Sequence, residues 1–396
     1  MKISLIQPGR NNLKYLKWSY DSIRKNQGNH EVEICVADDA STDSTWDWCL
    51  EMMDKDPLFK ALKWDGPERV GHTILYDRLV NEVATNDICM IYHADMYLCP
   101  GALDAIEDEL KEKTIVSLTR IEPPLHPDGP EKILKDFGVE PEEFKEQELL
   151  EFLDSRVPND DITEGIFAPW AFWKSDFQEI GGHDPLYAPQ SKEDSDIFNR
   201  FQLNGIKFIQ TWHGCVYHMT CRGSRRNTVD KAKNIYEDSP EWLAQNMRST
   251  RNFIRKWGHF VKHDALMKPI IPSKYNIGII LSQNDPKLLK ELEPWCSNIY
   301  CDNELRKHYI ELEQKDTIMN LSERVLPFSN EKNNEILVTI GNVYSQQDIN
   351  YISQLPEILD ADNELREEEF PCKFKLGNLE IEIFNLNTFE YDLINL

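Results

Sequence analysis

Residues 31–45, EVEICVADDASTDST, join an apolar run of strand length to a polar segment that begins with Asp38 and Asp39. The residues that follow, 45–53, have the apolar spacing of a helix. In open parallel sheets, ligands bind just outside the carboxyl ends of the strands, where these two aspartates are expected to lie. Helix capping explains Asp43 equally well, but it requires no pair of acids at the end of a strand.

The segments around this stretch alternate between strand and helix patterns. Strands are predicted at residues 3–7 and 88–92, and helices are predicted at residues 12–25 and 73–84. Alternation of this kind predicts β-α-β units and a mainly parallel sheet. The fold class expected for the first part of the chain is therefore α/β.

A second polar motif, His93-Ala94-Asp95, follows the strand predicted at residues 88–92, and a Pro-Gly pair at residues 100–101 precedes another helix pattern. An acid at the tip of an apolar strand can hold a divalent cation against a diphosphate. Oxygen and imidazole ligands suit Mn²⁺ or Mg²⁺. The alternative is an exposed loop that binds nothing.

Three stretches resemble the GT-A nucleotide-sugar glycosyltransferases, and among them the family 2 type. They are residues 3–11 (ISLIQPGRN), 36–45 (VADDASTDST) and 91–103 (IYHADMYLCPGAL). The later motifs that match are Gly181-Gly182, Glu193-Asp194 and His218. The resemblance covers residues 1 to about 225. It implies a Rossmann-like GT-A fold with flanking helices, and a nucleoside-diphosphate sugar as donor, with a UDP-sugar favoured.

The resemblance assigns Asp38 and Asp39 to the nucleoside. A carboxylate accepts hydrogen bonds from a base N–H or a ribose hydroxyl, whereas it meets a phosphate only through a cation. Gln7, Pro8 and Arg10 would frame the same pocket. A Pro-Gly turn after a strand also occurs without any function.

For the metal, the resemblance implies Asp95 as the main ligand, His218 as a second and His93 as a third. Ala94 would line the nucleotide-sugar site between them. The bound cation would act as a Lewis acid for the departing diphosphate. His93 stands where the family has the first aspartate of its DxD motif, so the choice between Mn²⁺ and Mg²⁺ stays open. For His218, a structural histidine after a strand is the alternative.

Asp194 is the expected general base of an inverting transfer, in which it deprotonates the acceptor hydroxyl. Glu193 would bind the acceptor or share this role, although an acidic helix N-terminus alone also explains the pair. Arg222 and Arg225, in a short basic loop, would stabilise the leaving diphosphate. Trp170 would contact a saccharide acceptor. Retaining enzymes share this fold, so the stereochemistry stays open.

The composition argues against several other classes of protein. With 396 residues and a net charge of −25, the chain lacks the basic surface that nucleic acids need. No apolar run approaches the roughly 20 residues of a membrane span. The N-terminus lacks the apolar core of a signal peptide, so a cytoplasmic protein is expected. The nine cysteines include no CxxC pair, which argues against a zinc knuckle.

Two domains are expected. The first, residues 1–268, would be the GT-A domain with a helical extension at about 226–268, and residues 269–272 would form a linker. The second, residues 273–396, is acidic and has the strand and helix patterns of a small α/β domain. It contains no recognisable catalytic motif. Acceptor recognition, oligomerisation and partner docking are all open for it.

The function expected from these features is metal-assisted transfer of a sugar to a hydroxyl of a saccharide or glycan acceptor. Two alternatives remain. One is a non-catalytic glycan-binding or scaffold protein with a degenerate transferase domain. The other is a sugar-nucleotide pyrophosphorylase, which would need a Gly-rich basic loop after the first strand, where the chain has only QPGRNN.

Overall fold

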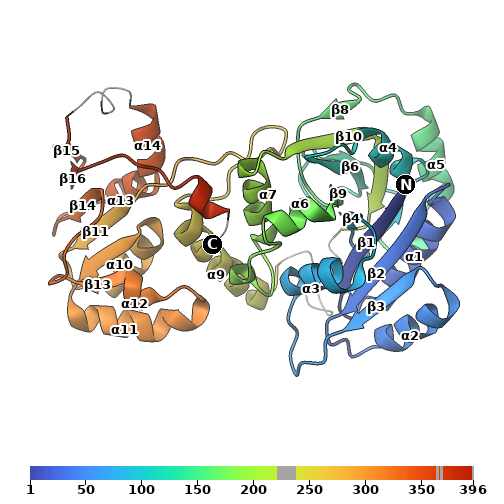
Figure 1. Ribbon diagram of the computed structural model, residues 1–396, viewed down its shortest axis with the longest axis horizontal. Coiled ribbons are helices and arrows are strands. Elements are labelled where there is room, and N and C mark those ends of the chain that lie inside the picture. Colours follow the sequence, from blue (N-terminus) through green and yellow to red (C-terminus); the bar gives the residue numbers. More distant parts are fainter. Residues whose placement is uncertain (221–237, 363–364, 366–368, 395–396) are drawn as a thin grey trace. The chain divides into compact units, whose positions relative to one another are not determined.

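The computed structural model describes the chain except for residues 221–237, 363–364, 366–368 and 395–396. The described residues form two compact units (Figure 1). Unit 1 comprises Met1–Gln245 and His263–Pro269, and unit 2 comprises Asn246–Lys262 and Ile270–Leu396. None of the helices among the described residues is long and apolar enough to cross a membrane.

Unit 1 is built on a ten-stranded sheet. Its strands are β1 (Lys2–Gly9), β2 (Glu31–Asp38), β3 (Phe59–Lys63), β4 (Ile88–Ile91), β5 (Met96–Leu98), β6 (Thr114–Glu122), β7 (Lys132–Leu134), β8 (Ile162–Thr163), β9 (Trp170–Trp173) and β10 (Lys207–His218). The main order is β3-β2-β1-β4-β9-β6-β10-β5. The neighbours from β3 to β4 are parallel, as are β6 and β10, whereas β9 and β5 are antiparallel to their neighbours. The predicted α/β class with a mainly parallel sheet is confirmed.

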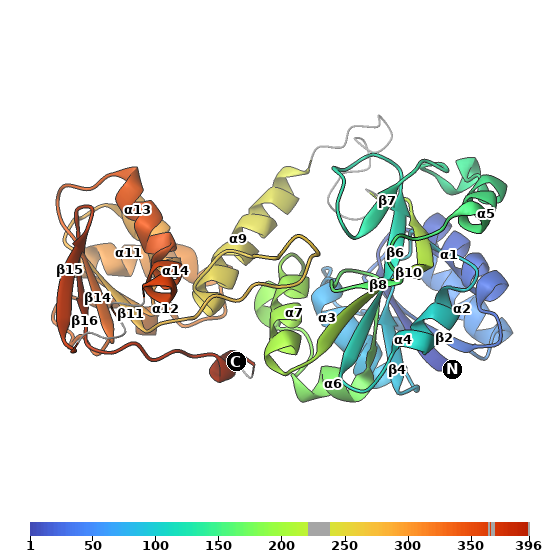
Figure 2. The same cartoon turned by 90° about the horizontal axis from the view of Figure 1, so that it is seen from above.

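Helices cover both faces of this sheet. Helices α1 (Leu13–Asn26), α2 (Thr45–Lys55) and α4 (Ala102–Glu109) lie on one face, and α3 (His72–Arg78), α6 (Lys174–Glu179) and α7 (Glu193–Leu203) lie on the other (Figure 2). A further helix, α5 (Glu146–Ser155), follows β7. Leu16 and Ile23 of α1 pack in one core cluster with Leu5 of β1 because residues seven apart share one helix face.

The predicted elements of unit 1 agree with the structure in type and place. The strand predicted at residues 3–7 is β1, and the helix predicted at residues 12–25 is α1. The helix predicted at 73–84 is interrupted, because α3 ends at Arg78 and a π-helical turn, Leu79–Val83, follows it. Such turns have a different number of residues per turn, so apolar spacing alone does not reveal them.

Unit 2 has a six-stranded sheet in the order β13-β12-β11-β14-β16-β15. The strands are β11 (Ile277–Leu281), β12 (Asn298–Cys301), β13 (Val325–Pro327), β14 (Ile336–Ile340), β15 (Cys372–Leu376) and β16 (Leu379–Ile383). The helices are α10 (Pro286–Leu292), α11 (Asn303–Glu313), α12 (Leu321–Arg324), α13 (Gln346–Ser353) and α14 (Leu355–Ala361). The predicted small α/β domain at the C-terminus is confirmed. The β15–β16 hairpin was not predicted from the sequence.

The boundary between the units differs from the predicted one at residues 268–273. Helix α9 (Pro240–Trp257) begins in unit 1 and ends in unit 2. Its later turns belong to unit 2 because Arg251 and Arg255 form ion pairs there with Glu313, at 2.7 and 2.9 Å. The helical extension assigned to the first domain is therefore divided between the two units.

Candidate active site

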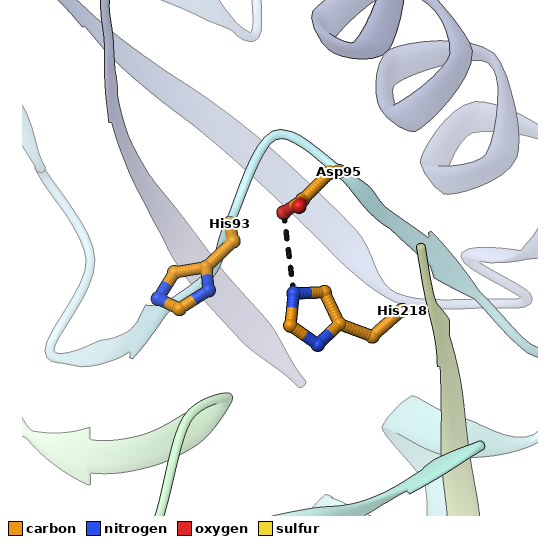
Figure 3. Close-up of side chains that lie close together, drawn as sticks. All are labelled: His93, Asp95 and His218. Atoms are coloured by element: carbon orange, nitrogen blue, oxygen red, sulfur yellow. Dashed lines mark ion pairs between the residues drawn. The ribbon is translucent and has the colours of Figure 1, made fainter. Parts of the chain in front are cut away.

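Three potential metal ligands meet at one edge of the unit 1 sheet. His93 and Asp95 lie in the turn between β4 and β5, and His218 is the last residue of β10. Strands β5 and β10 pair with Met96 opposite His218, and this pairing brings His218 to Asp95. One ligand atom of each of the three side chains lies within 4.8 Å of the other two. Figure 3 shows the Asp95 carboxylate facing the His218 imidazole, with His93 beside them.

The His218 ring is held between two carboxylates. Its Nε2 lies 3.4 Å from Oδ1 of Asp95, and its Nδ1 lies 2.7 Å from Oε1 of Glu122. Burial disfavours the charged imidazole, but the two carboxylates outweigh burial and raise the pKa of His218 to about 9. Burial also disfavours a charged Asp95, yet the nearby His218 charge prevails and lowers the pKa of Asp95 to about 2. Glu122 thus orients the ring with Nε2 toward Asp95.

His93 differs from His218 in its charge. Burial lowers the pKa of His93 to about 4, so its ring is neutral at pH 7 and keeps a nitrogen lone pair for a cation. Two imidazole nitrogens and one carboxylate oxygen suit Mn²⁺, whereas Mg²⁺ prefers oxygen ligands. The residues at this position therefore fit a divalent cation held by His93, Asp95 and His218.

The two aspartates after the apolar part of β2 have different surroundings. Asp39 accepts hydrogen bonds from the backbone N–H of Val70 at 2.7 Å and of Gly71 at 3.0 Å, one on each carboxylate oxygen. It ties the end of β2 to the start of α3. Oδ2 of Asp38 is buried and has no hydrogen-bond partner among the described residues. Asp38 therefore has the oxygen that a ligand can still use.

The other residues predicted for the donor lie at the ends of β1 and β4. Gln7 is buried, and its Nε2 donates to the backbone oxygen of His93 at 3.4 Å. Its Oε1 has no partner among the described residues. Pro8 is half-buried, Arg10 is exposed, and Ala94 is buried in the turn that carries the metal ligands. Gln7 thus joins the end of β1 to that turn.

Glu193 and Asp194 are the first two residues of α7. Oε1 of Glu193 lies 2.6 Å from Nε2 of His72, and its Oε2 is buried without a partner among the described residues. Asp194 is partly exposed. Burial, and then the adjacent charge of Glu193, raises the pKa of Asp194 to about 6. A carboxyl group with a pKa closer to neutral is a better general base than an ordinary aspartate, provided that it is still ionised.

Tyr76 of α3 packs against two histidines near the acids of α7. Its ring centroid lies 5.5 Å from that of His72 and 5.3 Å from that of His183. Burial, followed by the charges of Asp194, Glu193 and Asp95, raises the pKa of Tyr76 well above its usual value. The charges of the α7 acids and of Asp95 therefore act on the same buried phenol.

Comparison with protein families matches the stretch that includes His93 and Asp95. Residues 4–181, a little under half of the chain, match the model of glycosyl transferase family 2. The matched residues lie within unit 1. The match confirms the predicted resemblance to GT-A enzymes and the predicted enzyme class. Among curated protein sequences, none matches the chain.

Solved structures of glycosyltransferases are similar over part of the chain. A mannosyltransferase from Pyrobaculum calidifontis in complex with GDP-Man and Mn²⁺ is 17% identical over 67% of this chain and 66% of its own, with a TM-score of 0.43. GalNAc-T7 with UDP, GalNAc and Mn²⁺ is 13% identical over 64% of this chain and 48% of its own, with a TM-score of 0.45. S. aureus TarS in complex with UDP-GlcNAc is 13% identical over 64% of this chain and 73% of its own, with a TM-score of 0.39.

Sequence reasoning assigned no role to three side chains that lie next to one another beside Glu193, namely His72, Tyr76 and His183. The available signal for the first two was Gly71 before the predicted helix. Gly71 has φ of 86°, and a Cβ there would stand 2.1 Å from the backbone oxygen of Pro189. The glycine therefore allows the start of α3 to approach the segment that leads to α7.

Trp170 is a core residue, which corrects the predicted acceptor contact. It is fully buried in β9, with its ring centroid 4.6 Å from that of Phe172 and 5.6 Å from that of Phe198. Strand β9 lies inside the sheet between β4 and β6, with helices on both faces, so this side chain is covered. Arg222 and Arg225, the predicted diphosphate contacts, lie outside the described residues.

Proposed function

We propose that the protein transfers a sugar from a nucleoside-diphosphate sugar to a hydroxyl of a saccharide or glycan acceptor, with inversion at the anomeric carbon. The observation that carries this proposal is the meeting of His93, Asp95 and His218 within 4.8 Å of one another, together with Asp194, whose charge acts on the same buried Tyr76 as that of Asp95. A cation site for the leaving diphosphate and a basic carboxylate for the acceptor are the two groups that this displacement requires.

The donor would lie along the sheet edge from β2 to the β4–β5 turn. Oδ2 of Asp38 and Oε1 of Gln7 are buried acceptors that have no partner in the part of the chain that the structure describes, which suits the N–H groups of a nucleobase or the hydroxyls of ribose. His93, Asp95 and His218 would hold Mn²⁺ or Mg²⁺. When bound, the cation supplies Lewis-acid stabilisation of the departing diphosphate.

A UDP-sugar remains the favoured donor. Mn²⁺ is favoured over Mg²⁺ because two of the three proposed ligands are imidazoles. Arg222 and Arg225 remain proposed contacts of the leaving diphosphate, since guanidinium groups bind phosphate through two parallel hydrogen bonds.

Asp194 would act on the acceptor. It takes the proton of the acceptor hydroxyl while that oxygen bonds to the anomeric carbon, and the bond from this carbon to the diphosphate breaks. The raised pKa of Asp194 makes it a stronger base than an ordinary aspartate, and it is still ionised at pH 7. Such a base contributes about 10²–10⁴-fold to the rate.

Nucleotide binding tests the proposed function. The thermal stability of the full chain is measured with UDP, GDP, dTDP and CDP, each with and without Mn²⁺. A nucleotide present at 100 times its dissociation constant should add about 2.7 kcal/mol of stability. We expect one nucleotide to stabilise the chain only with Mn²⁺, and Asp95→Ala to abolish this effect. Absence of stabilisation by all four would contradict the proposed cation-assisted transfer.

Three further parts of the proposal come from the sequence alone. The protein would act in the cytoplasm. It would serve the synthesis of a polysaccharide or another glycan. Unit 2 would contribute to acceptor recognition or to oligomerisation.

A further inference from the structure

Helix α3 contacts the segment that carries the proposed base at two points. Near the start of the helix, Nε2 of His72 lies 2.6 Å from Oε1 of Glu193. Near its end, Asp77 accepts a hydrogen bond from the backbone N–H of His183 at 3.0 Å and lies 2.8 Å from Nδ1 of the same residue. The segment from residue 183 to residue 193 is thus attached to α3 at both ends.

The backbone between these two points packs closely on α3. Thr73 donates a hydrogen bond through Oγ1 to the backbone oxygen of Pro189 at 3.2 Å, and Gly71 leaves no room for a side chain against the same residue. On its other side, the start of α3 is tied to β2 by the two hydrogen bonds that Asp39 accepts. The position of His72 is therefore set by two neighbouring segments, the end of β2 and residues 183–193, before any ligand binds.

The contact between His72 and Glu193 is an ion pair inside the site. Burial disfavours the charged forms of both His72 and Glu193. The attraction between their opposite charges outweighs this effect, so the pKa of His72 is raised and the pKa of Glu193 is lowered. This pairing uses only one carboxylate oxygen. The other, Oε2, is buried and has no partner among the described residues. An unpaired buried oxygen is costly, and a donor from a bound ligand removes that cost.

Glu193 and Asp194 differ in what holds them. Glu193 is buried and fixed by His72, whereas Asp194 is partly exposed. A carboxylate fixed at one oxygen presents its second oxygen in one direction, which suits recognition of a hydroxyl. The less restrained neighbour can take a proton. The two adjacent acids therefore have different chemical tasks.

We propose that His72 is a positioning residue that acts through Glu193, holding its Oε1 so that Oε2 accepts a hydrogen bond from a hydroxyl of the acceptor sugar. This inference rests on the proposed function. His72 itself does not touch the acceptor. Asp194 remains the group that takes the proton of the reacting hydroxyl. The consequence is a separation of effects, because loss of His72 weakens acceptor binding and leaves donor binding unchanged.

The test uses the full chain with the variants His72→Ala, His72→Gln and Glu193→Ala, together with the His72→Ala/Glu193→Ala double variant. Transfer is measured from the nucleotide sugar of the best-binding nucleotide, with Mn²⁺, to p-nitrophenyl glycosides of glucose, galactose, mannose and N-acetylglucosamine. We expect His72→Ala to raise the acceptor KM about tenfold, the value for one lost hydrogen bond of about 1.4 kcal/mol. The donor KM should stay within twofold.

Two comparisons separate positioning from a general structural effect. The amide of His72→Gln can still donate to Glu193, so this variant should recover most of the acceptor affinity. The double variant should be no worse than Glu193→Ala, because His72 acts only through Glu193. A control is His213→Ala, since His213 is exposed and pairs with Asp161 at 2.8 Å through its Nε2.

Failure of this inference and failure of the proposed function would give different results. An unchanged acceptor KM in His72→Ala, an equal loss of donor affinity, or additive effects in the double variant would overturn this inference and leave the proposed function standing. A wild-type chain that binds no nucleotide, or that transfers to none of the glycosides, would overturn the proposed function and this inference with it.

Discussion

Units 1 and 2 each bury a group of charged side chains, and the two groups differ in whether their buried polar atoms have hydrogen-bond partners. In unit 2, the Glu293 cluster consists of Arg251, Arg255, Glu293, Glu313 and Arg324. Glu293 is fully buried and accepts hydrogen bonds from Arg255 at 2.8 Å and from Arg324 at 2.8 Å. Among the described residues, no buried side-chain nitrogen or oxygen of this cluster lacks a partner.

In unit 1, buried polar atoms at the site remain unpaired. Oε2 of Glu193, Oδ2 of Asp38 and Nε2 of His183 have no partner among the described residues. Buried polar groups in folded proteins are almost always hydrogen-bonded, so unpaired ones need a reason. In unit 2, the charges hold the domain together. In unit 1, we propose that a bound ligand supplies the missing partners.

The largest effect should come from Asp194. We expect Asp194→Asn to lower the turnover number by about 10²–10⁴-fold, because the amide cannot take the acceptor proton. Nucleotide binding should stay unchanged. Nucleoside diphosphate release in a coupled assay measures the rate, and Asp161→Asn, at an exposed site, is the matched control. Wild-type turnover in Asp194→Asn would mean that Asp194 is not the base.

The next effect concerns the stability of the Glu293 cluster. Glu293→Ala should destabilise unit 2 by about 3–5 kcal/mol, since it leaves buried arginines without a counter-charge. The matched change in unit 1, Glu193→Ala, should cost about 1 kcal/mol or less, because His72 is partly exposed and an unpaired oxygen is removed. Urea unfolding of each variant measures both values. Equal losses would remove the distinction between the two units.

The pH dependence of transfer should reflect the base. Asp194 must be ionised to act, and its pKa is raised to about 6. Below this pH, kcat/KM should fall about tenfold for each pH unit, and above it kcat/KM should level off. The same shift favours the protonated form in the folded state, so this group makes the fold less stable as pH rises from about 4 to 6. A profile at saturating Mn²⁺ with its midpoint near pH 4 would contradict the prediction.

The smallest effect separates the two aspartates after β2. Asp38→Asn should weaken nucleotide binding about tenfold, or about 1.4 kcal/mol, because a charged acceptor becomes neutral. Asp39→Asn should instead lower the melting temperature, because both Asp39 oxygens hold backbone N–H groups in the free protein. Calorimetry of binding and thermal unfolding of the same two variants check this. The reverse pattern would assign the nucleoside to Asp39.

The sequence predicted which edge of the sheet carries the candidate site, but not all of the residues that lie there. Asp95 was named because it stands at the end of a strand, and strand ends can be recognised from apolar runs. His218 was named because the family resemblance implied a later histidine ligand. His72 and His183 each follow a glycine that marks a turn, but the sequence does not show which segment such a turn packs against. They belong to the site only because α3 packs on the segment before α7.

The predicted acceptor contact of Trp170 was wrong for a different reason. An aromatic side chain near a glycine turn suits a sugar contact and a core position equally well, and the sequence does not state what lies above the strand. The structure places β9 between β4 and β6, so the side chain is enclosed. Burial in a sheet interior depends on strand order, which apolar spacing does not encode.

The sequence by itself determined the α/β class, the acidic strand ends and the resemblance to family 2 glycosyltransferases, because these depend on local periodicity and short motifs. Tertiary structure alone decided which of two adjacent carboxylates bonds to a distant segment. Asp39 rather than Asp38 bonds to the start of α3, and Glu193 rather than Asp194 pairs with His72. It also decided where unit 1 ends, since α9 is drawn into unit 2 by ion pairs with distant acids. Hydrogen bonds between segments far apart in the chain set these outcomes, and no single stretch of sequence contains both partners.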